Sequence, residues 1–403
     1  MHKEKLTATI FLSALLLFFL WNVSVNGSKV IAAVSDSIQE MESISDTADF
    51  VLATESAINE NLLGREELIE LYGLTQLILG KQEFNNFSFM KDENNVLYYG
   101  SIHNGIDYNM EVYVKRVRRL KEYVEDSGKQ FMFVMAPDNY LGNSNEVDEE
   151  LAINDQNANM DLFLWKANEN MIDTVDLRET ILNLDFEYEQ LYFRTDHHWT
   201  PLAAFYAAQT IVEKFEEFYG VQLDPDHYYM DLEQYDMTCI ENCVLGSAGD
   251  NVGMIYSGGL EDITILTPKF ETNYTYQYLN DDGTLTENTG EFDGVLLIRN
   301  YLVEGKLDGE KTYLHGIKDS DTIINHNNPD APTVLVLRDS YFSPVATFLS
   351  PMFSEMHMVW INTDDNPGFD TEAYVKEHVD EYDYVIMEVY SHSYDESCFS
   401  FFE

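Results

Sequence analysis

The feature of the sequence that most constrains its fold is a series of short apolar segments, which alternate with helix-like segments from about residue 107 onward. The segment 131–135 lies between Gly128 and Pro137, and it follows a segment of helical periodicity at 108–125. Apolar runs of this length between turn residues are typical of strands that are buried on both faces. We therefore expect an α/β domain whose sheet is covered on both sides.

Several other segments fit this alternation of strands and helices. Strands are expected at 174–177, 190–193, 333–337, 356–361 and 384–389. A helix is expected at 201–219, because Thr200 is a good N-cap residue and Pro201 suits the first helical position. Ser343 and Pro344 indicate in the same way a helix that runs through Phe348.

The stretch from about 224 to 330 has a different composition, rich in Tyr, Thr, Asn, Asp and Gly. Turn signals occur at Gly258-Gly259, around Gly283 and at Asp293-Gly294, and they predict an antiparallel β-rich insertion. Acidic turn residues such as Asp281 and Asp282 are of the type that binds extracellular Ca²⁺, although scattered surface carboxylates are the simpler interpretation.

The N-terminal segment predicts contact with a membrane. No charged residue occurs between Lys5 and Lys29, and this apolar run is just long enough to cross the hydrocarbon core. Lys3 and Lys5 precede the run and acidic sequence follows it, so the positive-inside rule exports everything after about residue 28. The alternative is a cleaved signal peptide, since small residues lie at plausible positions near Gly27.

The acidic composition restricts the partners of this chain. Its 403 residues include 23 Lys and Arg against 72 Asp and Glu, which gives a formal net charge of −49. Nucleic acid is excluded as the first expected partner, because its binding requires a basic patch. A uronic-acid polymer is also disfavoured unless the binding groove is locally basic, since like charges repel. Three cysteines close at most one disulfide, so the state of Cys239, Cys243 and Cys398 is open.

The densest group of chemically active side chains is Arg194-Thr195-Asp196-His197-His198-Trp199-Thr200-Pro201. The positive end of the following helix disfavours an imidazolium, which holds a histidine neutral and available as a base. If the backbone is extended, Asp196 accepts a hydrogen bond from one ring nitrogen of His198, and the other nitrogen faces a nucleophile. The alternative is that Asp196 caps the turn and both histidines are structural.

A candidate nucleophile follows the expected strand 333–337, which ends at Arg338-Asp339-Ser340. A serine at the carboxyl end of a buried strand, next to a helix N-terminus, lies where α/β folds place nucleophiles. The backbone N–H of Ser340 would then contribute to an oxyanion hole. The alternative is that Asp339 and Ser340 only terminate the strand.

Together these motifs resemble a known family. The run Asp196-His197-His198-Trp199 is the signature of the bacterial DHHW family, and the block from Leu337 to Tyr341 resembles its downstream Asp-Ser-aromatic block. These proteins resemble the SGNH hydrolase-like domains of the alginate O-acetyltransferases. The resemblance covers most of residues 85–403 and implies an SGNH hydrolase-like, flavodoxin-like three-layer domain at 85–403 with the β-rich insertion at about 224–330. The membrane anchor or signal peptide would occupy 1–28, and a tether with a helical segment would occupy 29–84.

The resemblance implies a catalytic triad in which Asp196 orients the base, His198 is the base and Ser340 is acylated. The role of His197 is left open, because its position is not a triad member in the alginate enzymes. Trp199 is expected to pack behind the motif rather than bind sugar. Arg338 stands where ordinary SGNH sequences carry glycine, and it is expected either to bind an anionic substrate or to point to solvent.

Two further strand ends carry polar residues. Asn139 follows the strand 131–135 at a position where many members of the family carry lysine, and its amide is a candidate oxyanion donor. His392 follows the strand 384–389; a surface histidine is the favoured interpretation, and a role in the site is the alternative.

The leading functional hypothesis is an extracytoplasmic serine-dependent O-acetyltransferase or acetylesterase that acts on a cell-surface polysaccharide through an acyl-serine intermediate. The resemblance to alginate-type systems implies a membrane-bound partner that passes the acyl group across the membrane. The alternative is a non-catalytic polysaccharide-binding or assembly protein with a vestigial triad, to which the many tyrosines would contribute stacking. A metal-dependent hydrolase using Asp196, His197, His198 and a distant His227 is disfavoured, because adjacent histidines rarely bind one metal. No cofactor or metal is expected.

Overall fold

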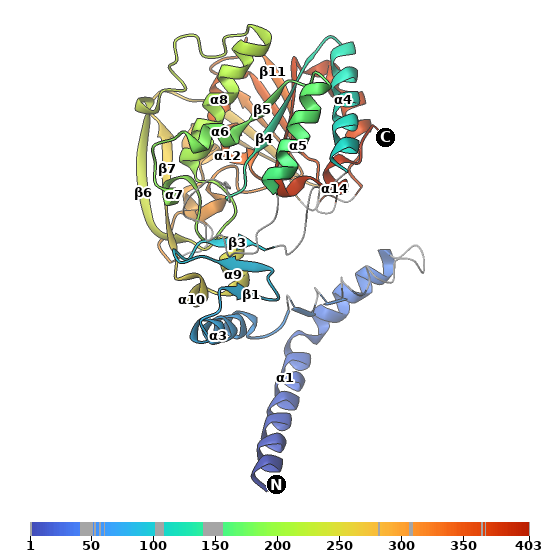
Figure 1. Ribbon diagram of the computed structural model, residues 1–403, viewed down its shortest axis with the longest axis vertical. Coiled ribbons are helices and arrows are strands. Elements are labelled where there is room, and N and C mark those ends of the chain that lie inside the picture. Colours follow the sequence, from blue (N-terminus) through green and yellow to red (C-terminus); the bar gives the residue numbers. More distant parts are fainter. Residues whose placement is uncertain are drawn as a thin grey trace. The chain divides into compact units, whose positions relative to one another are not determined.

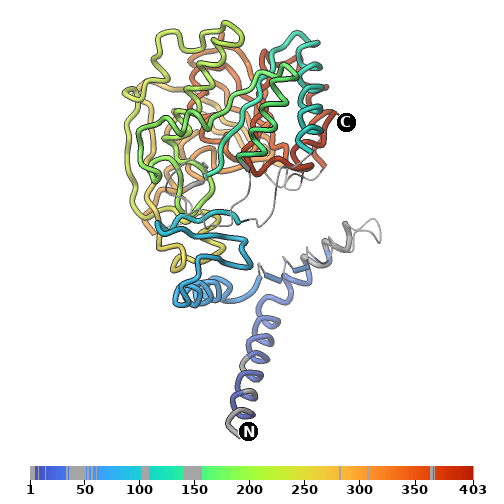
Figure 2. Tube along the Cα trace, in the orientation of Figure 1, coloured from blue at the N-terminus to red at the C-terminus, as the bar shows by residue number. Residues whose placement is uncertain are grey.

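The computed structural model describes residues 2–40, 51, 54–55, 58–59, 61–100, 109–139, 156–280, 283–305, 309–363, 366 and 368–402 (Figure 2). The chain divides into two compact units, residues 1–79 and 80–403, and each is described by itself. The candidate Ca²⁺ residues Asp281 and Asp282 lie outside the described residues.

The first unit is helical, with α1 at His2–Glu40 and α3 at Arg65–Ile78. The segment Lys5–Ala32 of α1 is long and apolar enough to cross a membrane, and a signal sequence near an N-terminus has the same properties. Its large apolar side chains, such as Phe11 and Leu17, are exposed. The segment is therefore not a buried core helix.

The second unit is built on a mixed eight-stranded sheet of order β5-β4-β13-β11-β12-β10-β8-β9. The parallel strands are β5 (Thr174–Asp176), β4 (Gln130–Ala136), β13 (Tyr384–Tyr390), β11 (Thr333–Arg338) and β12 (Glu355–Trp360). The antiparallel strands are β10 (Ser320–Asn325), β8 (Tyr274–Leu279) and β9 (Leu285–Gly290). Because parallel strands end at one edge, the residues that follow β4, β13, β11 and β12 meet there.

Helices cover both faces of this sheet (Figure 1). One face packs against α6 (Leu177–Leu182), α8 (Pro201–Tyr219) and α12 (Phe342–Leu349). The other packs against α4 (Met110–Asp126), α5 (Gln156–Glu169), α13 (Thr371–His378) and α14 (Glu396–Phe399). Val334 and Val336 of β11 belong to the first core, whereas Leu335 and Leu337 belong to the second. Burial on both faces explains the continuous apolar runs and confirms the expected α/β arrangement.

The stretch 224–330 contains antiparallel strands, but only part of it stands outside the main sheet. The strands β6 (Tyr235–Val244) and β7 (Glu261–Pro268) pair in a sheet of their own, whereas β8, β9 and β10 extend the main one. The short helices α9 (Ser247–Val252) and α10 (Met254–Ser257) lie between β6 and β7, and α11 (Phe292–Val295) follows β9.

The remaining elements are small. A three-stranded sheet consists of β1 (Glu83–Phe84), β2 (Phe89–Lys91) and β3 (Leu97–Tyr99), and its apolar side chains pack on α9 and α10. Short 3₁₀ helices occur at η2 (Leu232–Gln234), η3 (Arg299–Tyr301), η4 (Gly309–Thr312), η5 (Ser350–Met352), η6 (Val379–Glu381) and η7 (Ser391–Ser393).

Two expected elements differ from the structure. The strand expected at 190–193 is wrong: the helical turn α7 (Tyr188–Leu191) stands there, and Tyr192 forms only an isolated bridge with Trp199. Its apolar residues are buried all the same, and a short apolar run does not distinguish a buried turn from a strand. The helix α12 begins at Phe342, ahead of the expected start near Ser343. No disulfide joins Cys239, Cys243 and Cys398, all of which lie in the described part of the chain.

Candidate active site

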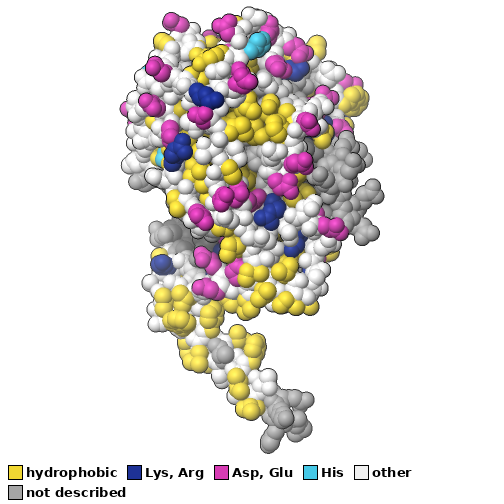
Figure 3. Space-filling model, turned by 90° about the vertical axis from the view of Figure 1, so that its left-hand side faces the viewer, with side chains coloured by type: hydrophobic (Ala, Val, Ile, Leu, Met, Phe, Trp, Pro, Cys, Tyr) yellow, Lys and Arg dark blue, Asp and Glu magenta, His cyan; other side chains and the backbone are white. Residues whose placement is uncertain are grey.

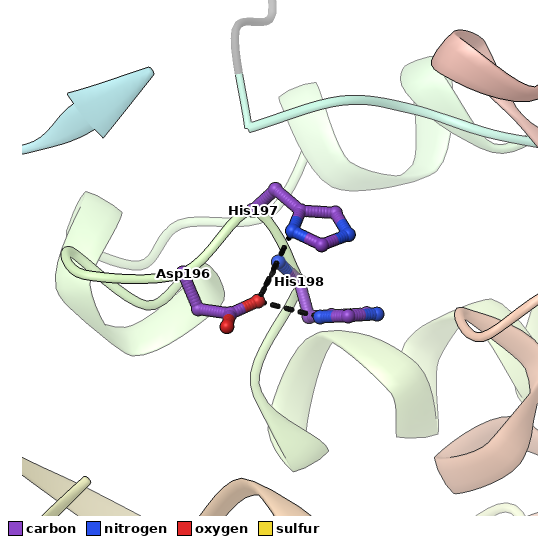
Figure 4. A group of neighbouring side chains, drawn as sticks. All are labelled: Asp196, His197 and His198. Atoms are coloured by element: carbon purple, nitrogen blue, oxygen red, sulfur yellow. Dashed lines mark hydrogen bonds and ion pairs between the residues drawn. The ribbon is translucent and has the colours of Figure 1, made fainter. Parts of the chain in front are cut away.

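Asp196, His198 and Ser340 form a continuous chain of contacts. Asp196 Oδ1 lies 2.5 Å from His198 Nδ1, and His198 Nε2 lies 2.7 Å from Ser340 Oγ. Figure 4 shows Asp196 beside both histidine rings, just before the start of a helix. The structure thus brings together the three residues that the sequence singled out from two distant segments.

Local structure explains how each residue reaches this position. The side chain of Thr200 caps α8 by accepting from Ala203 N, and Pro201 is the first residue of α8, as the sequence predicts. Asp196 Oδ1 also accepts the backbone N–H of His198 at 2.9 Å, which closes a tight turn before the helix. Ser340 follows the central strand β11, so it lies at the carboxyl edge of the sheet.

Asp196 is held ionised although it is buried. Burial opposes its charge, but His198 and His197 next to it and its hydrogen bonds from His198 hold its pKa far below the usual range. Its second oxygen, Oδ2, accepts the backbone N–H of Ser247 at 2.6 Å. Gly246 allows this approach, because an added Cβ would collide with the side chain of Asp196. A carboxylate fixed in this way favours the histidine tautomer that carries its proton on Nδ1.

Glu261 of β7 holds the backbone just ahead of Asp196, and the sequence did not single it out. Its carboxylate accepts the backbone N–H groups of Arg194 and Thr195, both at 2.6 Å, and the hydroxyl of Thr195. The hairpin β6–β7 therefore supports the segment that carries Asp196. No feature of the sequence marks Glu261, because it is one of many acidic residues in an acidic chain.

Trp199 and Tyr341 connect the motif to the serine segment. The buried Trp199 donates its indole N–H to the carbonyl oxygen of Tyr341 at 3.1 Å, and Tyr341 donates its hydroxyl to the carbonyl oxygen of His197. Tyr341 also stacks on Tyr390, with ring centroids 4.6 Å apart. Trp199 thus packs behind the motif, as expected.

His197 lies beside His198, with ring centroids 4.0 Å apart. Burial and the neighbouring His198 lower its pKa to about 3, so it is uncharged at neutral pH. Its Nδ1 is 3.4 Å from Asp196 Oδ1 and makes no hydrogen bond with any residue that the structure describes. His197 is therefore a neutral neighbour of the base.

A second aspartate–histidine pair lies at the same edge of the sheet. His392, in η7 after β13, places Nε2 2.5 Å from Oδ2 of Asp138, which follows β4. Burial opposes both charges, but their attraction and hydrogen bond lower the pKa of Asp138 and raise that of His392. The interpretation of His392 as a surface histidine is wrong, because its side chain is only 21% exposed. The sequence shows neither the strand order nor this pairing.

Two buried carboxyl groups, those of Asp339 and Glu388, lie close to the segment that carries Ser340. Asp339 accepts the backbone N–H groups of Tyr341 at 3.0 Å and Tyr390 at 2.7 Å, which holds the turn that carries Ser340. Glu388 of β13 hydrogen-bonds Asp339. Burial and the charge of Asp339 raise the pKa of Glu388 well above its usual value, so Glu388 is the protonated partner.

Two residues expected near the substrate are engaged elsewhere. Arg338 is fully buried, with Nη2 2.8 Å from Oδ1 of Asp321 in β10, so it neither binds an anionic substrate nor points to solvent. Asn139 is buried as well, and its amide donates to the carbonyl oxygen of Leu97 at 3.1 Å, so this amide does not face the serine as an oxyanion donor. Both side chains turn into the protein because strands that are distant in sequence supply their partners.

A cleft of about 940 Å³ opens at this edge of the sheet. Among its lining residues are His197, His198, Ser340, Tyr390 and His392. The lining also includes Tyr313, His315, Trp360 and Asn362. Residues of the Asp–His–Ser contacts and His392 of the second pair thus line one cavity. Its volume lies in the range of clefts that bind small molecules or short oligomers.

The cluster Asp196, His197 and His198 also has the composition of a metal site, with ligand atoms within 4.8 Å of one another. However, Asp196 Oδ1 and His198 Nδ1 bind each other, and His198 Nε2 faces Ser340. The additional ligand suggested from the sequence, His227, lines a different depression beside Asp226 and Asp231. The donor set does not fit a metal, because His198 has no ring nitrogen left for an ion.

Comparison with known proteins agrees with these observations. Residues 101–233 match the family described as "SGNH hydrolase-like domain, acetyltransferase AlgX". The chain resembles the SGNH hydrolase-like domain of the AlgX acetyltransferases. No curated protein sequence is significantly similar to the chain.

Solved structures share the fold of this SGNH hydrolase-like chain. PatB1 of Bacillus cereus has a TM-score of 0.64 at 19% identity, over 78% of this chain and 99% of that one. A second PatB1 structure, which carries a sulfonyl adduct, has a TM-score of 0.62 at 18% identity, over 78% and 97%. A DHHW family protein from Eubacterium siraeum has a TM-score of 0.53 at 19% identity, over 76% and 90%. At these identities the likeness establishes an α/β SGNH-like fold.

Proposed function

We propose that this chain is an extracytoplasmic serine-dependent O-acetyltransferase or acetylesterase that acts on a cell-surface polysaccharide through an acyl-serine intermediate. The observation that carries the proposal is the contact chain from Asp196 through His198 to Ser340 at the wall of the cleft. The AlgX family description supports acetyl transfer as the reaction, and the apolar α1 supports a location outside the cytoplasm.

The first half of the reaction forms the acyl-enzyme. His198 Nε2 takes the proton of Ser340 Oγ as this oxygen attacks the acyl carbonyl carbon, and Asp196 stabilises the resulting imidazolium through Nδ1–H. The backbone N–H of Ser340 stabilises the negative oxygen of the tetrahedral intermediate. His198 then gives its proton to the leaving oxygen of the donor, and the acetyl group remains on Ser340.

The second half of the reaction transfers the acetyl group. A sugar hydroxyl, or water in an esterase, gives its proton to His198 and attacks the acyl-serine carbonyl. When the intermediate collapses, His198 returns the proton to Ser340 Oγ. The neutral His197 beside His198 adds no positive charge that would oppose the imidazolium.

The proposal is tested with residues 29–403 and nitrophenyl acetate. Ser340→Ala and His198→Ala are each expected to lower turnover by about 10³-fold or more, and mass spectrometry is expected to find acetyl on Ser340 of the wild type. Matched controls are Ser354→Ala and His378→Ala, which lie away from the cleft lining and should retain wild-type turnover.

The alternatives give different results. A chelator is expected to leave turnover unchanged, because the proposed mechanism uses no metal; loss of activity with recovery on adding Zn²⁺ would favour the metal-dependent reaction. Equal inactivity of the wild type and both variants, with no acetyl-serine, would favour a polysaccharide-binding protein with a vestigial triad.

A further inference from the structure

The cleft is larger than an acetyl group requires. Its volume of about 940 Å³ accommodates a sugar unit with neighbours on either side of the reacting hydroxyl. Aromatic side chains are among its lining residues: Tyr390, which is partly exposed, and the more deeply buried Tyr313 and Trp360. Aromatic faces provide apolar contact area for the C–H faces of sugar rings. The cleft therefore has the size and lining of a glycan subsite.

The exposed charges at the cleft are mainly acidic. Asp250 of α9 and Asp319 ahead of β10 are exposed and line it. Lys311 of η4 is the only Lys or Arg among the described residues that line it. The groove therefore lacks the local basic patch that a polyanion would require.

Other cationic groups near the cleft do not change this balance. Arg338, two residues before Ser340 in the sequence, is buried against Asp321. The positive charge of His392 is paired with Asp138. Burial and the nearby Lys318 lower the pKa of His315, which is therefore uncharged at neutral pH.

The charge of the whole molecule has the same sign. The formal net charge is −49, and acidic side chains are spread over the face shown in Figure 3, with fewer Lys and Arg between them. This field repels an approaching polyanion before any contact forms, and salt screens the repulsion.

We propose that the glycan bound in this cleft is uncharged, such as a chain of hexoses or N-acetylhexosamines, and that uronic-acid polymers are rejected by charge. This inference rests on the proposed function and names the substrate class of the same site. Asp250 and Asp319 are then specificity-determining residues, because they place negative charge where the flanking sugars would lie.

The experiment compares neutral oligosaccharides of glucose and N-acetylglucosamine with galacturonate and mannuronate oligosaccharides of equal length. Equilibrium binding is measured with the Ser340→Ala variant, so that the result does not depend on catalysis. Neutral oligosaccharides are expected to bind at least about tenfold more tightly in about 0.01 M salt. Raising the salt to about 1 M shrinks the Debye length from about 30 to about 3 Å and should reduce this preference, with little effect on the neutral sugars.

Charge-reversal variants test whether the preference for neutral oligosaccharides arises from the acidic residues at the cleft. Asp250→Lys with Asp319→Lys in the Ser340→Ala background is expected to strengthen uronate binding about tenfold. The matched control is Glu213→Lys with Asp330→Lys in the same background, which changes the net charge equally at two exposed positions outside the cleft lining. This control should change uronate binding much less than the cleft double variant does.

Two outcomes overturn the inference. One is uronate binding at least as tight as that of neutral sugars at low salt, and the other is binding of neither kind. Failure of the proposed function is detected by a separate measurement. In that case no acetyl group is found on Ser340 when the wild type is treated with nitrophenyl acetate, whichever sugars bind.

Discussion

At the scale of single residues, Asp196 contributes through its geometry and its charge. It contacts His198 at both the ring Nδ1 and the backbone N–H, and its pKa lies far below the usual range. It therefore stays ionised throughout the pH range in which a histidine base titrates. A loss of rate in mild acid would therefore not come from protonation of Asp196.

The substitution Asp196→Asn tests this role. The amide group of the new side chain would be able to donate toward His198 Nδ1, which favours the wrong tautomer, so turnover of nitrophenyl acetate is expected to fall about 10³- to 10⁴-fold. KM should change little, because Asp196 contacts the base and not the substrate. Steady-state kinetics on the folded variant check this, and a loss below about tenfold would contradict the role.

The pair of Asp138 and His392 makes stability depend on pH. The raised pKa of His392 means that its contribution is fully present below its unfolded value, about 6.5, and is lost as pH rises through the folded value. The lowered pKa of Asp138 means that its contribution is present above about 3.9 and is lost as pH falls through the folded value. The pair therefore stabilises the fold most in mildly acidic solution.

His392→Gln tests this linkage, because glutamine keeps a donor for Asp138 without the charge. The free energy of unfolding should be lower in the variant near pH 5.5, by about 1–3 kcal/mol, and the difference should shrink toward pH 9. Denaturant titrations at several pH values measure it. A difference that is constant over this range would show that the charge of His392 does not contribute.

At the scale of elements, the hairpin β6–β7 with α9 positions the Asp–His turn. Ser247 N donates to Asp196, and Glu261 accepts from Arg194 and Thr195. The close packing of Gly246 on Asp196 leaves no room for a side chain.

Gly246→Ala is therefore expected to displace the turn and to lower turnover at least about 10²-fold, because catalysis is sensitive to shifts of about 1 Å. The melting temperature should fall as well, since the backbone around Gly246 or Asp196 must move to make room for the added methyl group. Ser247→Ala is the matched control: it removes only a hydroxyl that contacts Tyr99 and keeps the N–H that Asp196 needs. Equal activity of the two variants would show that the close approach is unimportant.

At the scale of the whole molecule, the apolar part of α1 and the cleft belong to different units of the chain. The apolar segment lies within residues 1–79, whereas every described residue that lines the cleft lies within 80–403. Anchoring and chemistry are therefore expected to be separable.

The full chain is expected to sediment with membranes, and residues 29–403 are expected to remain in solution with the same turnover of nitrophenyl acetate. Fractionation followed by the activity assay measures both. Sequencing the N-terminus of the mature protein separates an anchor from a signal peptide, because a new terminus after about residue 28 would show cleavage.

The sequence by itself determined the features that local pattern encodes. Continuous apolar runs predicted β4, β11, β12 and β13, and Thr200 with Pro201 predicted the start of α8. The spacing of Asp196 and His198 predicted their pairing on condition of an extended backbone, with a structural role as the alternative; the structure makes the contact in a tight turn instead.

Only the tertiary structure decided the surroundings of these residues. That Ser340 faces His198, that Arg338 is buried against Asp321 and that His392 pairs with Asp138 all depend on the order of strands in the sheet. The same holds for Glu261, which reaches the motif from β7. Periodicity records which face of an element is buried, but not which distant element covers it, so the partners of polar side chains at the sheet edge became visible only in the folded chain.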